Sequence, residues 1–383
     1  MTDPIMNTND MLDDVETPAV LLDVTRMVGN LRAMQDLADR HGVSLRPHIK
    51  THKSLEIGRR QIALGASGVT VATVDEAQVF IEGGFESITV ARPVVSPGKW
   101  DRLLSAVKAH GTDLRVVTDS KKGIQVAGER AAAHEQIVRL FLKIDVGLHR
   151  CGLLPNDPRV GELAGMIHDH DNLEFRGILS HAGHVYGAKS RAEAAEVAEA
   201  ERRTMVAVRD ALQSDGLPVR EVSVGATPAV LATERFDGIT EIRPGNYVFL
   251  DLLPARVGVA GVADAALTVL ATVISRNEHY FVTDAGSKTL TSDTGVHGMT
   301  GNQGFGLAYP ASGFLEREGE MIVEKVSEEH GMVGRNGLDL AIGSKIRVVP
   351  VHSCPVANLA RSYAVLTPDG LETWPVDAAG GSR

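Results

Sequence analysis

The feature that most constrains the fold is a regular alternation, between residues 17 and 250, of short β-branched apolar runs with longer segments of helical period. This alternation predicts strands that are each followed by a helix, as in a parallel sheet. About eight such units in roughly 240 residues favour a TIM-like (β/α)8 barrel over an open, doubly wound sheet. The predicted strands are 19–23, 44–47, 68–72, 87–91, 114–118, 138–144, 174–179 and 221–224. The clearest predicted helices are 25–41, with Thr25 as a candidate cap, 56–63, 75–83 and 191–213.

The pattern changes near residue 255, where strand-like runs separated by turns replace the helical period. A chain of 383 residues exceeds the size at which one hydrophobic core stops growing, so a second domain is expected. We predict a barrel over residues 16–255 and a mainly β domain over 256–383, with residues 1–15 a candidate for packing on the β domain. The predicted strands of this domain are 267–275, 280–284, 321–327, 345–350 and 363–366.

Charge and composition argue against several classes of partner. A net charge of -10 and only 4% aromatic residues leave neither a basic surface for phosphates nor rings for base stacking, so nucleic acid is not expected. The longest apolar stretches, such as 265–274, are about half of what a bilayer requires. The polar, acidic start of the chain does not resemble a signal peptide, which predicts a cytoplasmic protein without membrane segments. With only Cys151 and Cys354, free thiols or a metal ligand are expected rather than disulfides.

The loop after the second predicted strand holds the first candidate for chemistry. It places Lys50 among His48, His52 and Lys53, and reacting groups of a parallel barrel come from the C-terminal ends of its strands. A lysine that forms a Schiff base must be partly desolvated, and the cofactor that it holds needs a phosphate-binding cup. An ordinary solvated loop carries the same residue types, so this loop alone decides nothing.

Two glycine-containing turns, 223–228 and 243–247, provide such a cup. They follow the last strands of the predicted barrel, where phosphate sites recur, and they offer backbone amides and hydroxyl groups. The candidate phosphate-binding residues are Gly225, Thr227, Gly245, Asn246 and Tyr247.

Two further loops carry polar candidates. Arg150 follows the run 138–144 and has the forked geometry that meets a phenolate or carboxylate, although a surface arginine is the plain alternative. His181 is a candidate general base and Tyr186 a candidate partner for the cofactor ring. A structural role for this histidine is the alternative.

His352 and Cys354 form a candidate metal pair. In an extended chain, residues two apart project to the same face, so imidazole and thiolate can converge on one cation. This donor pair favours Zn²⁺ over Mg²⁺ or Ca²⁺. Two ligands leave open positions for water or substrate oxygens, which suits catalysis, whereas a buried pair without metal is the alternative.

In combination, these motifs resemble the D-threonine aldolase and D-serine dehydratase family of fold-type III pyridoxal-phosphate enzymes, over about residues 16–375. The resemblance implies an alanine-racemase-like barrel followed by a β domain, in a homodimer with active sites at the subunit interface. It implies that Lys50 is the Schiff-base lysine, that Arg150 lies beside the cofactor ring oxygen, and that a divalent metal binds the substrate's β-hydroxyl group. It also implies the phosphate and metal ligands Gly225, Thr227, Tyr247, His352 and Cys354. The motifs are Glu16-Thr17-Pro18-Ala19-Val20, Arg46-Pro47-His48-Ile49-Lys50, 147–152, 180–183, 224–228, 244–247 and 352–354.

The resemblance leaves two reactions open. Cys354 is typical of the dehydratases, whereas the continuation Pro355-Val356-Ala357-Asn358-Leu359 resembles the aldolases. We predict a lyase that uses pyridoxal phosphate and Zn²⁺ or Mn²⁺, with Mg²⁺ less suited, and that cleaves D-β-hydroxy amino acids to glycine and an aldehyde. His181 or a metal-bound hydroxide is the expected base. The alternative is dehydration of D-serine or 3-hydroxy-D-aspartate to a keto acid and ammonia, with Lys50 taking the α-proton.

Two other classes stay open. A non-catalytic pyridoxal-phosphate-binding protein would be shorter and would lack the β domain. A racemase would need a second acid or base, commonly a tyrosine, and the tyrosines after residue 255 have no recognisable context. The glycine-rich segment 295–306 has the composition of a mobile lid or of a long loop.

Overall fold

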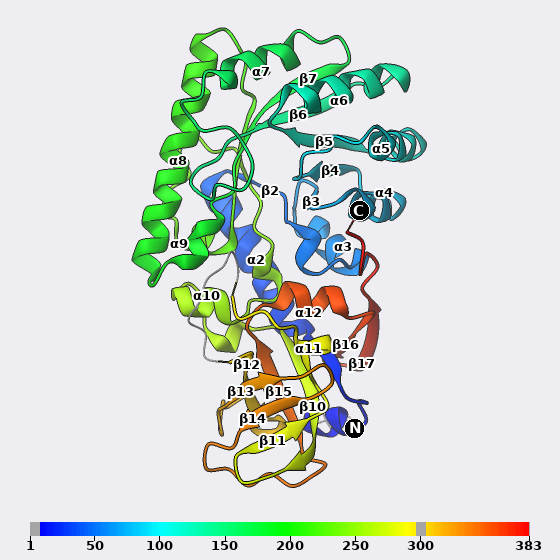
Figure 1. Ribbon diagram of the computed structural model, residues 1–383, viewed down its shortest axis with the longest axis vertical. Coiled ribbons are helices and arrows are strands. Elements are labelled where there is room, and N and C mark those ends of the chain that lie inside the picture. The colour runs from blue at the N-terminus through cyan, green and yellow to red at the C-terminus, as the bar shows by residue number, and fades with distance from the viewer. Residues whose placement is uncertain (1–7, 296–303, 383) are drawn as a thin grey trace, which may run out of the picture. The chain divides into compact units, whose positions relative to one another are not determined.

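The computed structural model describes residues 8–295 and 304–382, and its backbone is drawn in Figure 1. The chain divides into two compact units. The barrel unit comprises Arg32–Lys50, Leu55–Gly245 and Gly381–Arg383, and the β unit comprises Met1–Leu31, Thr51–Ser54 and Asn246–Gly380. No helix among the described residues is long and apolar enough to cross a membrane.

Eight parallel strands form the barrel unit, in the order β2-β9-β8-β7-β6-β5-β4-β3. A bridge between His48 and Thr70 joins the two ends of this order and closes the ring. The strands are β2 (Ser44–Leu45), β3 (Val69–Val71), β4 (Ser87–Val90), β5 (Asp113–Thr118), β6 (Val138–Lys143), β7 (Leu173–Leu179), β8 (Glu221–Val224) and β9 (Glu241–Ile242). The helices of the barrel region are α2 (Val24–His41), α3 (Leu55–Ala63), α4 (Val74–Glu82), α5 (Pro97–His110), α6 (Lys121–Ala133), α7 (Arg159–His168), α8 (Arg191–Ser214) and α9 (Thr227–Ala232).

The barrel strands are buried on both faces, which explains why they are continuous apolar runs rather than alternating ones. Val117, Phe141 and Leu179 form a core cluster contributed by three neighbouring strands, β5, β6 and β7. The helices cover the outside, and the caps that start them are local. Thr73 and Ser190, for example, accept hydrogen bonds from the backbone N–H groups three residues on, which begin α4 and α8.

Ion pairs fill the inside of the barrel where apolar side chains do not. Arg46 on the β2 side donates from Nε to Glu241 Oε2 of β9 at 2.7 Å, and both side chains are at most 3% exposed. Arg115 of β5 donates to both carboxylate oxygens of Glu221 on β8, at 2.9 and 3.2 Å. The first pair joins the neighbouring strands β2 and β9, and the second joins the non-neighbouring strands β5 and β8. In both pairs the two partners lie more than 100 residues apart in the chain.

Replacement of Glu241 by alanine is therefore expected to destabilise the barrel strongly. Removal of one partner leaves the Arg46 charge buried without compensation, and such losses reduce the free energy of unfolding by about 3–5 kcal/mol. The exposed pair between Arg102 and Asp75 provides the control, because Arg102→Ala should cost less than about 1 kcal/mol. Chemical denaturation followed by circular dichroism measures both, and equal losses would contradict the expectation.

The β unit is built on a nine-stranded sheet in the order β11-β14-β13-β12-β15-β10-β1-β16-β17. An additional pairing of β11 with β10 closes its first six strands into a small barrel, from which the last three extend. The strands are β1 (Ala19–Asp23), β10 (Leu267–Arg276), β11 (Tyr280–Thr283), β12 (Gly306–Pro310), β13 (Met321–Val326), β14 (Gly331–Gly334), β15 (Lys345–Pro350), β16 (Ser362–Thr367) and β17 (Gly370–Pro375). The helices are α1 (Thr8–Asp13), α10 (Leu252–Val257), α11 (Ser287–Leu290) and α12 (Ser353–Leu359).

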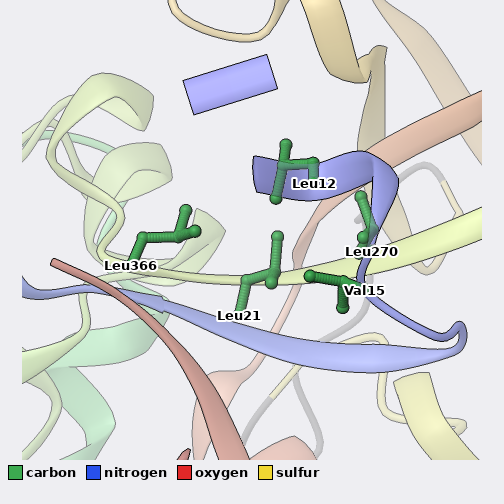
Figure 2. Packing of buried hydrophobic residues seen from close by; sticks show 5 residues of the cluster. All are labelled: Leu12, Val15, Leu21, Leu270 and Leu366. Carbon is green, nitrogen blue, oxygen red and sulfur yellow. The ribbon is translucent and has the colours of Figure 1, made fainter. Parts of the chain in front are cut away.

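The N-terminal segment is anchored in this unit by apolar packing. Leu12 at the end of α1 and Val15 pack with Leu21 of β1, Leu270 of β10 and Leu366 of β16, as Figure 2 shows. Lys345 adds polar contacts by donating from Nζ to the carbonyl oxygens of three residues of this segment, at 2.6 to 2.8 Å.

Two sequence-based predictions of local structure were wrong. The run 19–23 was expected to open the parallel barrel, but β1 pairs antiparallel with β10 and parallel with β16 in the β unit. A five-residue apolar run carries no information about its pairing partners, which explains the error. The cap of α2 is Asp23, whose Oδ1 accepts the Arg26 N–H at 3.0 Å, and not Thr25. Most of the segment 295–306, which we considered as a lid, lies outside the described residues.

Candidate active site

The lysine loop follows β2 at the C-terminal end of the barrel strands. Lys50 is half-buried in a short 3-10 helix, Ile49–Thr51, and His48 donates its backbone N–H to Pro244 O at 2.9 Å. The loops that follow β2 and β9 are thereby held together, so the lysine emerges from a fixed backbone.

Four cations surround two histidines at this end of the barrel. Burial, together with the charges of Lys50, Arg243 and Arg150, holds the pKa of His48 well below its ordinary value. Burial and the charges of Lys50, Lys143 and Arg150 do the same to the pKa of His181. Both imidazoles are therefore neutral at physiological pH, and the neighbouring cations suit an anionic ligand.

Lys143, the last residue of β6, is a component that the sequence analysis missed. Its side chain is buried, and burial together with the Arg243 charge lowers its pKa to about 7. A sizeable fraction of these amines is neutral near pH 7. In the sequence, Lys143 is visible only as a lysine at the end of an apolar strand. That its side chain is buried follows only once the strand is known to be part of a closed barrel.

His181 follows β7 and has a defined tautomer. Its Nδ1 lies 2.7 Å from Gly225 O, and because a carbonyl oxygen can only accept, Nδ1 must carry the proton. In the neutral ring Nε2 is then an acceptor. This is the form of histidine that removes a proton rather than donates one.

The turn between β8 and α9 presents backbone close to the β9 strand. Gly225 has a φ of +153°, and a Cβ atom there would lie 2.8 Å from Arg243 N. A side chain is excluded by both constraints. Thr227 is buried at the start of α9, so its backbone and hydroxyl lie in the same turn. Such a turn offers the open N–H groups that bind phosphate.

Two of the expected phosphate ligands belong to the β unit. Gly245 is the last residue of the barrel unit before the chain enters the β unit at Asn246. Asn246 and Tyr247 are buried in the 3-10 helix Asn246–Val248. Asn246 donates from Nδ2 to Asp251 Oδ2 at 2.6 Å, and its Oδ1 has no hydrogen-bond partner among the described residues.

The candidate metal pair lies where β15 ends and α12 begins. His352 is the N-cap of α12 and Cys354 the second residue of the helix, so the extended geometry we expected for this segment was wrong. The turn still brings the two side chains into a hydrogen bond. Although burial opposes a charge on His352, Cys354 and Asp293 raise its pKa to about 10. Cys354 Sγ also lies 3.3 Å from Thr51 Oγ1, and Thr51 directly follows Lys50 in the sequence.

The donor set of this pair fits a zinc ion. Thiolate and imidazole are the ligands that Zn²⁺ prefers, and a histidine with an elevated pKa beside a thiolate is the metal-free counterpart of such a site. Within residues 8–295 and 304–382, no group of three or more His, Cys, Asp or Glu side chains is arranged to hold a metal. His352 and Cys354 are the thiol and imidazole donors that the structure brings together here, and Asp293 Oδ2 lies 3.3 Å from His352 Nδ1.

Comparison with known proteins identifies the family. Residues 22–252 match the model of the alanine racemase N-terminal domain, and residues 266–366 match a putative serine dehydratase domain. D-threo-3-hydroxyaspartate dehydratase of Delftia sp. (strain HT23) is 33% identical over 377 residues, which are 95% of this chain and 98% of that protein. The chain belongs to this family of D-threonine aldolases and D-serine dehydratases. They are fold-type III pyridoxal-phosphate enzymes, so the chain is an enzyme of the lyase type.

Aldolases of the family are nearly as similar. A D-threonine aldolase of Arthrobacter sp. is 32% identical over 389 residues, covering 99% of this chain and 97% of that protein. The crystal structure of D-threonine aldolase from Filomicrobium marinum has a TM-score of 0.86 at 30% identity, covering 97% of this chain and 98% of that one. The family fold, a parallel barrel followed by an antiparallel β domain, is the one predicted from the sequence.

Solved structures of D-threo-3-hydroxyaspartate dehydratase add a relevant observation. A variant with one cysteine replaced by alanine was solved in a metal-free form, at a TM-score of 0.89 and 33% identity over 96% of this chain and 98% of that one. Another variant replaces a histidine two positions earlier in that protein. The spacing of the replaced residues equals that of His352 and Cys354 in this lyase.

The barrel unit of this lyase brings together most of the predicted site. Lys50, Arg150 and His181 interact electrostatically, and His181 bonds to Gly225 in the turn that leads to Thr227. Tyr186 lies half-buried in the same loop as His181, within the 3-10 helix Gly183–Gly187, and its role as a ring partner stays a prediction.

Proposed function

We propose that this lyase uses pyridoxal phosphate and a divalent metal to cleave D-β-hydroxy amino acids of the D-threonine type into glycine and an aldehyde. The observation that carries the proposal is the hydrogen bond between His181 Nδ1 and Gly225 O at 2.7 Å, which leaves Nε2 as an acceptor. Aldol cleavage requires a base that takes the proton of the β-hydroxyl group while the bond between Cα and Cβ breaks.

Pyridoxal phosphate fits the residues at the C-terminal end of the barrel. Lys50 would hold the cofactor aldehyde, the Gly225–Thr227 turn its phosphate, and Arg150 its ring oxygen. The surrounding cations suit the dianionic phosphate and the ring oxygenate. When bound, the cofactor supplies an electron sink for the electron pair of the broken bond.

His352 and Cys354 are proposed to hold the metal, with Zn²⁺ preferred over Mn²⁺ and Mg²⁺ because of the thiolate. The metal-free cysteine variant of the dehydratase supports this assignment. A substrate hydroxyl group that replaces water at the open position would be acidified, which eases removal of its proton.

The low pKa of His181 predicts an unusual pH dependence. An ordinary histidine of pKa 6.5 would become protonated, and useless as a base, as the pH falls through that value. Because burial and three cations depress the pKa of His181, its neutral form persists below pH 6.5. The rate constant kcat should therefore stay level from about pH 8 through pH 6.5 and fall only in more acid solution. A kcat that halves near pH 6.5 would contradict the assignment of His181 as the base.

Dehydration to a keto acid and ammonia is the second candidate, and Cys354 favours it because the dehydratase variants involve the same pair of residue types. Here the metal would carry hydroxide away, and Lys50 would remove the α-proton. In this reaction the metal takes the place of a general acid, so dehydration requires no proton from His181.

One assay separates the two reactions. The purified protein is supplied with pyridoxal phosphate, Zn²⁺ or Mn²⁺, and D-threonine, D-serine or 3-hydroxy-D-aspartate in turn. Glycine with an aldehyde supports aldol cleavage, and keto acid with ammonia supports dehydration. Bound cofactor with neither product would instead support a binding protein, and interconversion of D- and L-amino acids a racemase. The homodimer and the cytoplasmic location also stay proposals, which gel filtration and fractionation test.

A further inference from the structure

We infer that Glu201 on α8 is the positioning residue for His181, and this inference rests on the role proposed for His181 as a base. Glu201 is 3% exposed. Its Oε1 accepts the hydroxyl of Ser180 at 2.6 Å, and its carboxylate also accepts the backbone N–H of Ala182. Ser180 and Ala182 are the two neighbours of His181 in the sequence. One carboxylate is therefore hydrogen-bonded to the residues on both sides of His181.

The position of Glu201 is not explained by packing. Burial raises the pKa of this carboxyl group, because water no longer solvates the ionised form. The Ser180 hydroxyl and the charges of Arg243 and Lys143 act in the opposite direction. A buried acid is tolerated only where it is paired and hydrogen-bonded, so the contacts that Glu201 makes account for its presence at this place.

Arg243 fixes the other side of the same arrangement. Its guanidinium donates to Ser180 O, and from Nη1 to Val224 O at 3.2 Å. Val224 immediately precedes Gly225, whose carbonyl oxygen accepts the His181 Nδ1 proton. The residue before the histidine and the residue before its hydrogen-bond acceptor are therefore held by one buried guanidinium.

The backbone at His181 and the backbone at Gly225, which these contacts hold in place, determine the chemistry of the imidazole ring. The hydrogen bond to Gly225 O keeps the proton on Nδ1 and leaves Nε2 as the acceptor. If the His181 backbone shifted, the ring could turn or change tautomer, and the basic nitrogen would leave its place. Misplacement of a reacting group by about 1 Å can reduce a rate about 100-fold.

The test is Glu201→Gln, which keeps the size of the side chain but replaces one acceptor oxygen with an amide donor. That amide can face the Ser180 hydroxyl only if the direction of this hydrogen bond reverses, and facing the Ala182 N–H it loses that bond. In either case the charge-assisted hydrogen bonds become neutral ones, which are roughly half as strong. We expect kcat for D-threonine cleavage to fall by about 10- to 100-fold while KM changes less than about threefold. The nitrogen chemical shifts of the His181 ring, measured by NMR in ¹⁵N-histidine-labelled protein, should show loss of the single tautomer.

Glu76→Gln is the matched control. Glu76 is also a buried carboxylate on a barrel helix, and its Oε2 accepts the Ala72 N–H at 2.6 Å in the loop after β3. It should leave kcat and the His181 ring signals unchanged. Ser180→Ala is the second test variant if Glu201→Gln does not fold. It removes the hydrogen bond between the Ser180 hydroxyl and Glu201 without burying a new amide.

Unchanged kcat and unchanged ring signals in a folded Glu201 or Ser180 variant would overturn the inference and leave Glu201 with a structural role only. If the wild-type protein shows no lyase activity, the proposed function fails, but the ring signals still decide the positioning role. A shift of tautomer would then support it, and its absence would overturn it.

Discussion

Lys50→Ala is expected to abolish turnover and to leave the protein unable to hold pyridoxal phosphate covalently. The substitution removes the amine that is proposed to bind the cofactor, and removal of a covalent catalyst reduces rates by about three orders of magnitude or more. The protein should still fold, because Lys50 is half-buried in a loop rather than part of the core. Loss of the visible absorption of the bound cofactor and of product formation measures the effect.

Lys143 is the rival for this role. It is buried, and burial with the Arg243 charge lowers its pKa to about 7, which are the properties of a reactive amine. Borohydride reduction of the holoenzyme followed by peptide mapping distinguishes the two lysines. Modification at Lys143 in place of Lys50 would contradict the prediction. Lys53→Ala serves as the control from the same segment, since its Nζ donates to Asn358 Oδ1 at 2.6 Å and it should remain cofactor-loaded.

The strands could be predicted from the sequence wherever local pattern sufficed. The run 345–350, for instance, is β15 with the same bounds. The pairing partners of a strand are not determined by its own residues alone. The five residues of β1, for example, suit a parallel barrel and a mixed sheet equally well. The strands β12, β14 and β17 were missed because each contains or begins with glycine, which is uncommon in strands.

The candidate site was predictable to the extent that its residues follow strand ends. Lys50, Arg150 and His181 all do, and they meet at one end of the barrel. Lys143 and Glu201 were not predicted, because a charged residue at the end of an apolar strand or on a helix reveals its burial only when the barrel is closed around it. The tautomer of His181 depends on Gly225 O, which is 44 residues away in the chain, so no sequence pattern could contain it.

Cys354→Ala is expected to lose the metal, and with it the activity on β-hydroxy amino acids. Mutation of residues that only support the ligands of a metal site lowers metal affinity by about 10- to 100-fold. Because this variant removes one of the two proposed ligands themselves, metal affinity should fall by at least about 100-fold. Cofactor absorption should persist, because the lysine and the phosphate-binding turn belong to the barrel unit.

Cys151 offers the control for this variant, since it is the second of the two cysteines and is half-buried in the loop after β6. Metal content after gel filtration, and competition with a chromophoric chelator, should show loss in Cys354→Ala and His352→Ala but not in Cys151→Ala. Retention of one metal per chain in both of the first two variants would show that the pair is a hydrogen-bonded couple without a metal.

Because Asp293 and Cys354 raise the pKa of His352 to about 10 in the metal-free protein, metal binding must displace a proton from this histidine. Affinity should therefore increase steeply with pH between about 6 and 9, and a pH-independent affinity would argue that the cation binds elsewhere.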